Sequence, residues 1–103
     1  MPRPSIAHVA QKLGELYDKP FGGKPSGRFR ISPKMLRKIA ERQKLPERYI
    51  EDLTDELFEL GFVLLDMETY YAVASVRTFA SYRRLGEGSF EDVEDDGKKQ
   101  TIQ

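Results

Sequence analysis

Residues 32–61 read SPKMLRKIAERQKLPERYIEDLTDELFELG, and this stretch decides the fold. It opens with a helix start, because the Ser32 hydroxyl can cap a helix and Pro33 suits its first position. Apolar residues then recur at helical spacing as far as Pro46, which can end one helix and open the next. A second periodic run leads to Gly61, a residue suited to the position after a helix. The stretch therefore predicts two helices joined by a short turn.

These two predicted helices, Ser32–Gln43 and Pro46–Leu60, differ in the charge of their exposed sides. The first is expected to bury four residues and to present cations on its other side. The buried set is Met35, Leu36, Ile39 and Ala40. The second is expected to bury one apolar face and to expose five carboxylates. Its apolar residues are Tyr49, Ile50, Leu53, Leu57 and Leu60. Phe58 falls between the two sides, where it makes either a core contact, the favoured reading, or an interface.

Four further segments complete the expected element order. Ser5 can cap a helix that runs to about Tyr17, and residues 21–27 are a turn-rich loop that we expect to be mobile. Phe29–Ile31 alternates enough for a short edge strand. Two β-branched and aromatic runs, Phe62–Asp66 and Tyr70–Val76, predict a hairpin.

The C-terminal part of the chain gives weaker signals. Residues 78–85 are compatible with a last helical turn or with an extended arm. From residue 86 onward the sequence is strongly acidic and short of apolar residues, which predicts a disordered or loosely docked tail.

Residues 5–76 resemble a winged helix-turn-helix in the order and length of their elements. The central helix pair looks like its helix-turn-helix, and the predicted hairpin looks like the strands that flank its wing. The resemblance implies an α+β domain at residues 1–85, followed by an acidic flexible tail at residues 86–103. It also implies a protein that holds nucleic acid, with a regulatory or accessory role.

Composition narrows the class of protein. The 103 residues suffice for one domain with one core, and no apolar run reaches the length of a membrane span. The chain has no cysteine, which excludes disulfides and thiolate zinc sites. The start Met1-Pro-Arg-Pro has no hydrophobic segment of a secretory signal. We expect a cytoplasmic protein without a membrane partner.

An enzymatic reading has little support in the residues. His8 is the only histidine, and it falls off the apolar stripe of its helix, so a solvated surface position is expected. Glu51, Asp55 and Glu59 lie at one-turn spacing, but nothing near them in sequence completes an oxygen cage for a metal. The loop at residues 22–27 lacks the spacing and the preceding strand of a phosphate-binding loop. We expect no catalytic residue, metal, cofactor or small-molecule substrate.

The charges are segregated along the chain, although the formal net charge is zero. Residues 24–48 hold nine Lys or Arg and two acids, whereas residues 49–76 hold seven acids and no Lys or Arg. Residues 77–84 add three arginines, and residues 85–103 hold six acids and two lysines. Such blocks create a dipolar surface that suits a charged partner or a second copy. Alternatively, each block is only the solvated face of its own element.

The basic block is the candidate nucleic-acid-binding surface, because cations displace the counterions that condense on phosphates. Its residues are Lys24, Arg28, Arg30, Lys34, Arg37, Lys38, Arg42, Lys44 and Arg48. Two features depart from standard winged-helix docking. The helix that usually reads the major groove offers Arg48 and then five carboxylates, and the wing segment 67–69 carries no cation.

Two functions from different classes follow. In the first, the protein binds DNA or RNA through the loop, strand and helix of the basic block. In the second, the domain is a protein-interaction or dimerisation module in which a basic face meets an acidic one. The acidic residues for that contact are Glu51, Asp52, Asp55, Glu56 and Glu59, together with Phe58. The acidic tail could compete with nucleic acid, recruit a basic partner, or only aid solubility.

Overall fold

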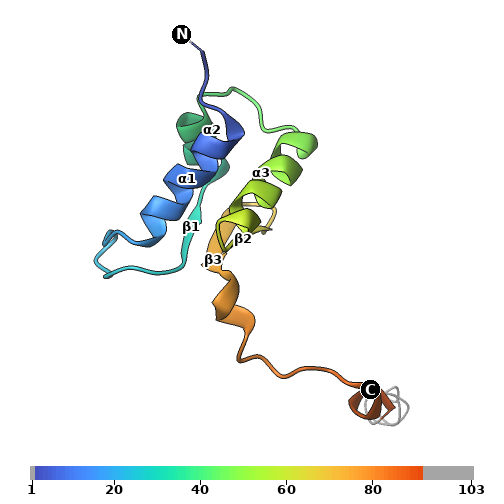
Figure 1. The fold of residues 1–103 in the computed structure, drawn as a ribbon. Coiled ribbons are helices and arrows are strands. Elements are labelled where there is room, and N and C mark those ends of the chain that lie inside the picture. Colours follow the sequence, from blue (N-terminus) through green and yellow to red (C-terminus); the bar gives the residue numbers. More distant parts are fainter. Residues whose placement is uncertain (1, 92–103) are drawn as a thin grey trace.

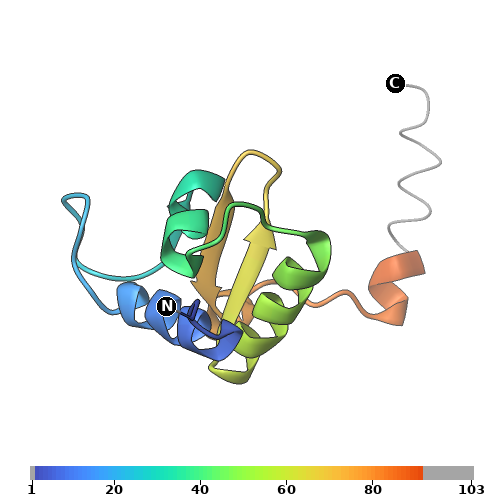
Figure 2. The ribbon, with the colours of Figure 1, turned by 90° about the horizontal axis from the view of Figure 1, so that it is seen from above.

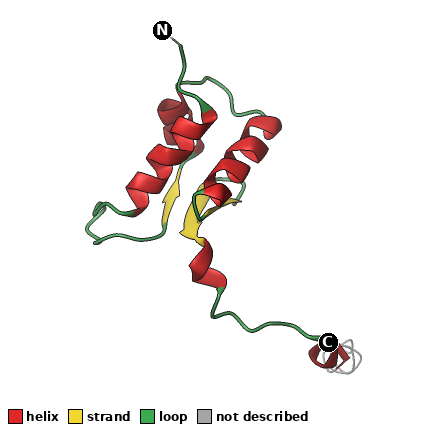
Figure 3. Ribbon diagram, in the orientation of Figure 1, coloured by secondary structure: helices red, strands yellow, loops and turns green. Residues whose placement is uncertain are grey.

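The computed structural model describes residues 2–91 and shows an α+β domain (Figures 1 and 3). The expected order of helix, strand, helix, helix, strand, strand is confirmed. The elements are α1 (Ile6–Tyr17), β1 (Phe29–Ile31), α2 (Pro33–Ala40), α3 (Glu47–Glu59), β2 (Phe62–Asp66) and β3 (Tyr71–Ser75). A 3-10 turn, η1 (Val76–Phe79), follows β3. Residues 92–103 lie outside the described part, so the predicted disorder of that stretch stays a prediction.

The three strands form an antiparallel sheet in the order β1-β3-β2, so β1 is an edge strand as expected. Alternate residues of each strand point to opposite faces of the sheet. Leu64 pairs with Val73, and Ile31 pairs with Tyr71. These four side chains are buried in the same cluster as residues of all three helices. The helices therefore pack on one face of the sheet.

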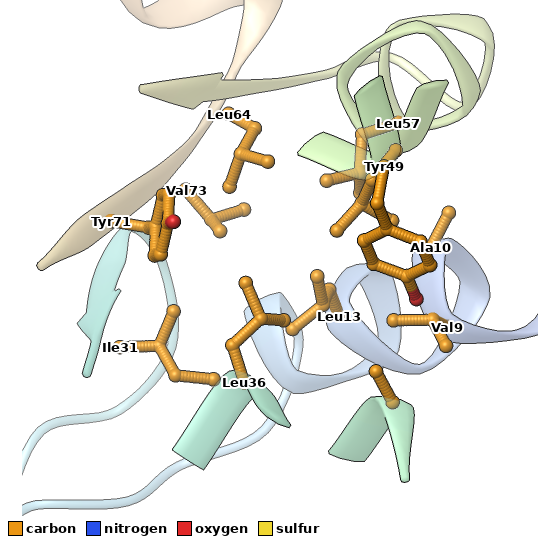
Figure 4. Packing of buried hydrophobic residues seen from close by; sticks show 12 residues of the cluster. Val9, Ala10, Leu13, Ile31, Leu36, Tyr49, Leu57, Leu64, Tyr71 and Val73 are labelled. Atoms are coloured by element: carbon orange, nitrogen blue, oxygen red, sulfur yellow. The ribbon is translucent and has the colours of Figure 1, made fainter. Parts of the chain in front are cut away.

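The core is one apolar cluster between the helices and this face of the sheet (Figure 4). Its fully buried large side chains are Val9, Leu13, Leu36, Leu53, Leu57 and Val73. Each such side chain contributes about 1.5–3 kcal/mol through removal from water. Gly14 allows α1 to approach the sheet, because an added Cβ would lie 2.9 Å from the Phe62 ring.

The helix ends follow the capping signals in the sequence. The Ser5 Oγ accepts a hydrogen bond from the His8 backbone N–H at 3.1 Å, and the Ser32 Oγ accepts one from Met35 at 3.1 Å. Gly61 follows α3 with φ of 91°, a left-handed conformation that favours glycine. The predicted caps at these three positions are confirmed.

Helix α2 is shorter than predicted, since it ends at Ala40 and not at Gln43. Glu41 adopts a left-handed conformation with φ of 54°. Its backbone N–H donates to the Lys38 carbonyl at 3.2 Å, and the Arg42 N–H donates to the Arg37 carbonyl at 3.0 Å. This pattern satisfies carbonyls at the helix end and stops the helix. The sequence did not indicate this helix end, because Glu41 is not the glycine that usually adopts a left-handed conformation after a helix.

Three apolar residues expected on buried faces are substantially exposed. Phe58 is 65% exposed, so the core reading of this ring is wrong; its place on the α3 surface leaves it uncovered. Met35 is 48% exposed because it lies on the flank of α2, away from Leu36 and Ala40. Leu60 is 50% exposed at the end of α3. The spacing of apolar residues predicts which side of a helix faces the core. How many of those residues become buried depends on the elements that pack against that side.

The loop between α1 and β1 contains a tight turn and extends outward from the domain (Figure 2). Phe21 and Lys24 exchange two backbone hydrogen bonds of 3.1 and 3.0 Å around Gly22 and Gly23. Both glycines have positive φ, as a hairpin turn of this kind requires. The Gly27 N–H donates to the Tyr17 carbonyl at 2.8 Å, which returns the loop to the end of α1.

The C-terminal boundaries differ slightly from the predictions. Strand β3 spans Tyr71–Ser75, because the Met67 N–H donates to the Tyr70 carbonyl and includes Tyr70 in the turn. Val76 begins the 3-10 turn and is not in the strand. Residues 87–91, within the expected disordered tail, form a helical turn.

Candidate nucleic-acid interface

The structure separates the nine predicted cations into groups with different surroundings. One group lies around the loop and β1, a second on the exposed side of α2, and a third between α2 and α3. The block is continuous in sequence, but its cations do not form one continuous set in space, since β1 and α2 turn their apolar sides toward the common core.

The first group lines a concave surface of about 530 Å³, here called the basic hollow. It lies between the loop and strands β1 and β3. Among the described residues, its lining includes four cations and no carboxylate. The cations are Lys19, Lys24, Arg28 and Arg30, and the aromatic residues are Phe21, Phe29 and Tyr70. All four cations are exposed. The arrangement concentrates positive charge in a recess, where it attracts anions more strongly than a flat surface does.

Strand alternation puts Phe29 and Arg30 on opposite faces of β1, and both border the hollow at this sheet edge. Ile31 is buried in the core, and Phe29 packs against it. Arg30 therefore projects from the opposite face of the sheet, where its cross-strand partner Ala72 also lines the hollow. The Arg30 guanidinium carbon lies 5.6 Å from the centroid of the Tyr70 ring, within the range of a cation–π contact.

The α2 cations have different degrees of exposure. Lys34 and Lys38 are exposed, and Arg37 is half-buried. Burial raises the pKa of Tyr71, the negative charge of Asp66 adds to this rise, and the positive charge of Arg37 opposes it. Arg37 thus acts electrostatically on the hairpin, whereas Lys34 and Lys38 are the α2 cations best placed for an external anion.

The remaining cations have internal partners or lie in the turn. The Arg42 guanidinium carbon lies 4.4 Å from the centroid of the buried Tyr49 ring, so Arg42 packs against the domain. The Arg48 Nε lies 3.2 Å from the Asp52 Oδ1, as part of an ion pair one helical turn apart. Lys44 is exposed in the segment that joins α2 to α3.

A second concave surface of about 660 Å³ lies between α3 and the hairpin, here called the acidic hollow. Its lining includes four carboxylates and, among the described residues, no cation. The carboxylates are Glu47, Glu51, Asp55 and Asp66. Of the predicted protein-interaction residues, the structure brings Glu51 and Asp55 together here. Phe58 follows Asp55 and Thr54 at the spacing of neighbours on a helix surface.

The other predicted α3 residues lie away from this hollow. Asp52 pairs with Arg48 and is half-buried, as is Glu56, while Glu59 is exposed. Within residues 2–91, no three His, Cys, Asp or Glu side chains gather in a way that could hold a metal ion. His8 is exposed, as predicted. No helix in the described part of the chain is long and apolar enough to cross a membrane.

Sequence reasoning missed three residues of the basic hollow: Lys19, Phe21 and Tyr70. Lys19 lies outside the basic block in sequence and joins it only because the loop doubles back. The adjacent glycines Gly22 and Gly23 could have indicated that the loop reverses direction, since two glycines favour a tight hairpin turn. Tyr70 reaches the hollow through pairing of β3 with β1, which no local pattern predicts.

Comparisons with known proteins give no identification: no family model, no curated protein and no solved structure matches this chain significantly. The functional argument therefore depends on the geometry of the two hollows.

Proposed function

We propose that this protein is a winged-helix nucleic-acid-binding protein that contacts phosphates through the basic hollow and the exposed cations of α2. The observation that carries the proposal is the gathering of Lys19, Lys24, Arg28 and Arg30 around one recess without a carboxylate among its described lining. Half or more of protein–DNA hydrogen bonds go to phosphate and sugar, and Arg and Lys are common donors.

The electrostatic state of these cations supports the proposal. The only ion pair within residues 2–91 joins Arg48 to Asp52, so no described carboxylate oxygen lies within 4.0 Å of a cationic nitrogen in the basic hollow. Cations without internal partners can exchange counterions and water for phosphate at a lower cost than paired ones.

The proposed contact differs from the usual docking of a winged helix. Helix α3 has a carboxylate-rich exposed side, which a polyanion would repel. The turn Met67–Tyr70 contains no cation, so it cannot act as a basic wing. The loop, β1 and α2 would face the nucleic acid, and α3 would face away from it.

A fluorescence-anisotropy titration with labelled nucleic acid tests the proposal. Four phosphate contacts predict an affinity loss of about a hundredfold for duplex DNA between roughly 50 and 200 mM salt. Arg28→Glu should weaken binding by about tenfold at the lower salt. Lys12→Glu is the matched control, because it makes the same charge change at an exposed position of α1 outside the hollow. Absence of binding to both duplex and single strands at about 50 mM salt would overturn the proposal.

One observation favours a second candidate function, a protein contact through α3. Phe58 is 65% exposed and lies one helical turn beyond Asp55, which lines the acidic hollow together with Glu51. Such a surface suits a basic partner or a second copy of the chain. Sedimentation velocity tests self-association: Phe58→Ser and the pair Glu51→Lys with Asp55→Lys should each lower the oligomer mass. An unchanged mass would exclude self-association through this surface.

A further inference from the structure

We infer that the basic hollow holds an unpaired nucleotide, so that the preferred ligand is single-stranded DNA or RNA. The inference rests on the proposed function and names the class of nucleic acid. It starts from the shape of the site. The hollow is an open recess of about 530 Å³, which is large enough to admit one nucleotide. A duplex is a stiff rod with its bases stacked inside, and it can touch only the rim of such a recess.

The second argument comes from an apolar hollow of about 390 Å³ that adjoins the basic one. The two surfaces share Lys19, Phe21, Phe29 and Arg30. The apolar part continues over Leu16, Pro20, Ile31, Met35 and Ile39. The cationic surface and the apolar surface thus adjoin each other, with Phe21 and Phe29 at their common border. An unpaired nucleotide has the same combination, an anionic phosphate joined through a sugar to a flat base, whereas a duplex presents mainly phosphates and sugars along its outside.

The third argument concerns Phe21, which begins the tight turn and is 47% exposed. Its ring lies edge-on to Phe29, with centroids 5.6 Å apart and an interplanar angle of 76°. Phe29 in turn packs against the core. The Phe21 ring is therefore supported at its edge while part of its surface stays open to solvent. A positioned and accessible aromatic ring is a platform on which a base can stack.

Arg30 supplies the link between phosphate and base recognition. It lines both hollows, and its guanidinium lies against the Tyr70 ring. A guanidinium plane can stack with a base as well as donate to a phosphate. Stacking tolerates every base because each has a π face, so we expect weak sequence preference.

The experiment compares the affinity for an unstructured single strand with the affinity for its blunt duplex at equal salt. The strand has about 15 nucleotides, a length that matches the site sizes of known single-strand binders. The single strand should bind about tenfold more tightly. Phe21→Ala should lower single-strand affinity by about tenfold and leave duplex affinity unchanged. Phe79→Ala is the matched control, because it removes an exposed phenylalanine that lies edge-on to another ring, Tyr82, outside the basic hollow. Circular dichroism of each variant establishes that it is folded.

A second variant gives a direct readout of stacking. The chain has no tryptophan, so Phe21→Trp introduces a single indole at the hollow, and Phe79→Trp introduces one in η1, outside the hollow. Single-stranded nucleic acid should quench the fluorescence of the first and not of the second. Equal affinity for both nucleic acids, with no specific effect of Phe21→Ala and no quenching, would overturn this inference while the proposed function stands. Absence of binding to either nucleic acid would overturn both.

Discussion

The basic and acidic hollows have comparable volumes, about 530 and 660 Å³, but their described linings carry charges of opposite sign. Two consecutive residues show how the fold separates them. Tyr70 lines the basic hollow, and Tyr71 lines the acidic one. Neighbouring residues along an extended chain point to opposite sides, so the start of β3 divides the two surfaces. A net charge of zero therefore says nothing about the local field that a ligand meets.

The largest expected effect comes from the core that supports both hollows. Leu36 lies in α2 and Leu53 in α3, and both are fully buried in one cluster. Leu36→Ala and Leu53→Ala should each lower the free energy of unfolding by about 2–5 kcal/mol. Chemical denaturation followed by circular dichroism and by tyrosine fluorescence checks this. Coincident transitions are expected; separate midpoints would show that the two sides unfold independently.

A smaller effect should divide the basic block into supporting and ligand-facing cations. Arg42→Ala removes the contact with the Tyr49 ring and should lower stability by about 1–2 kcal/mol, since the pair is partly buried. Lys44→Ala, at an exposed position two residues away, should change stability by less than about 0.5 kcal/mol. Denaturation measures both variants. If Arg42→Ala is as stable as Lys44→Ala, the Arg42 contact does not support the fold.

The end of α2 offers a stabilising substitution. Glu41 has φ of 54°, a conformation that costs energy for residues with a Cβ. Glu41→Gly should therefore stabilise the protein by about 0.5–1 kcal/mol without moving either hollow. Glu41→Ala is the control, because it removes the same charge but keeps the Cβ. Equal thermal midpoints for the two variants would contradict this account.

The smallest effect is a dependence on pH that appears only in alkaline solution. Burial raises the pKa of Tyr71 in the acidic hollow, and the charge of Asp66 raises it further. Because the folded pKa exceeds the unfolded value of about 10, this contribution to stability is complete below pH 10 and is lost as pH rises through the folded pKa. Tyr71→Phe should reduce the alkaline loss, and Asp66→Asn should reduce it by less. Thermal midpoints between about pH 8 and 11 measure it; equal losses in all three proteins would argue against the Tyr71 contribution.

Much of the fold could be predicted because its signals are local. The caps at Ser5, Ser32 and Gly61 involve neighbours in sequence, and the element order follows from periodicity. Predictions failed where packing decided the outcome. Phe58 and Met35 were expected to be buried, but the surfaces that would have covered them are absent from the described fold.

For the candidate sites, the sequence by itself determined that positive and negative charges lie in separate blocks, because composition along a chain is visible without a structure. Only the tertiary structure decided which charges meet. The return of the loop to Tyr17 adds Lys19 to the basic hollow, the turn before β3 adds Tyr70, and packing on Tyr49 engages Arg42. The physical reason is that a recess is formed by segments distant in sequence, and their approach is set by strand pairing and core packing rather than by local propensity.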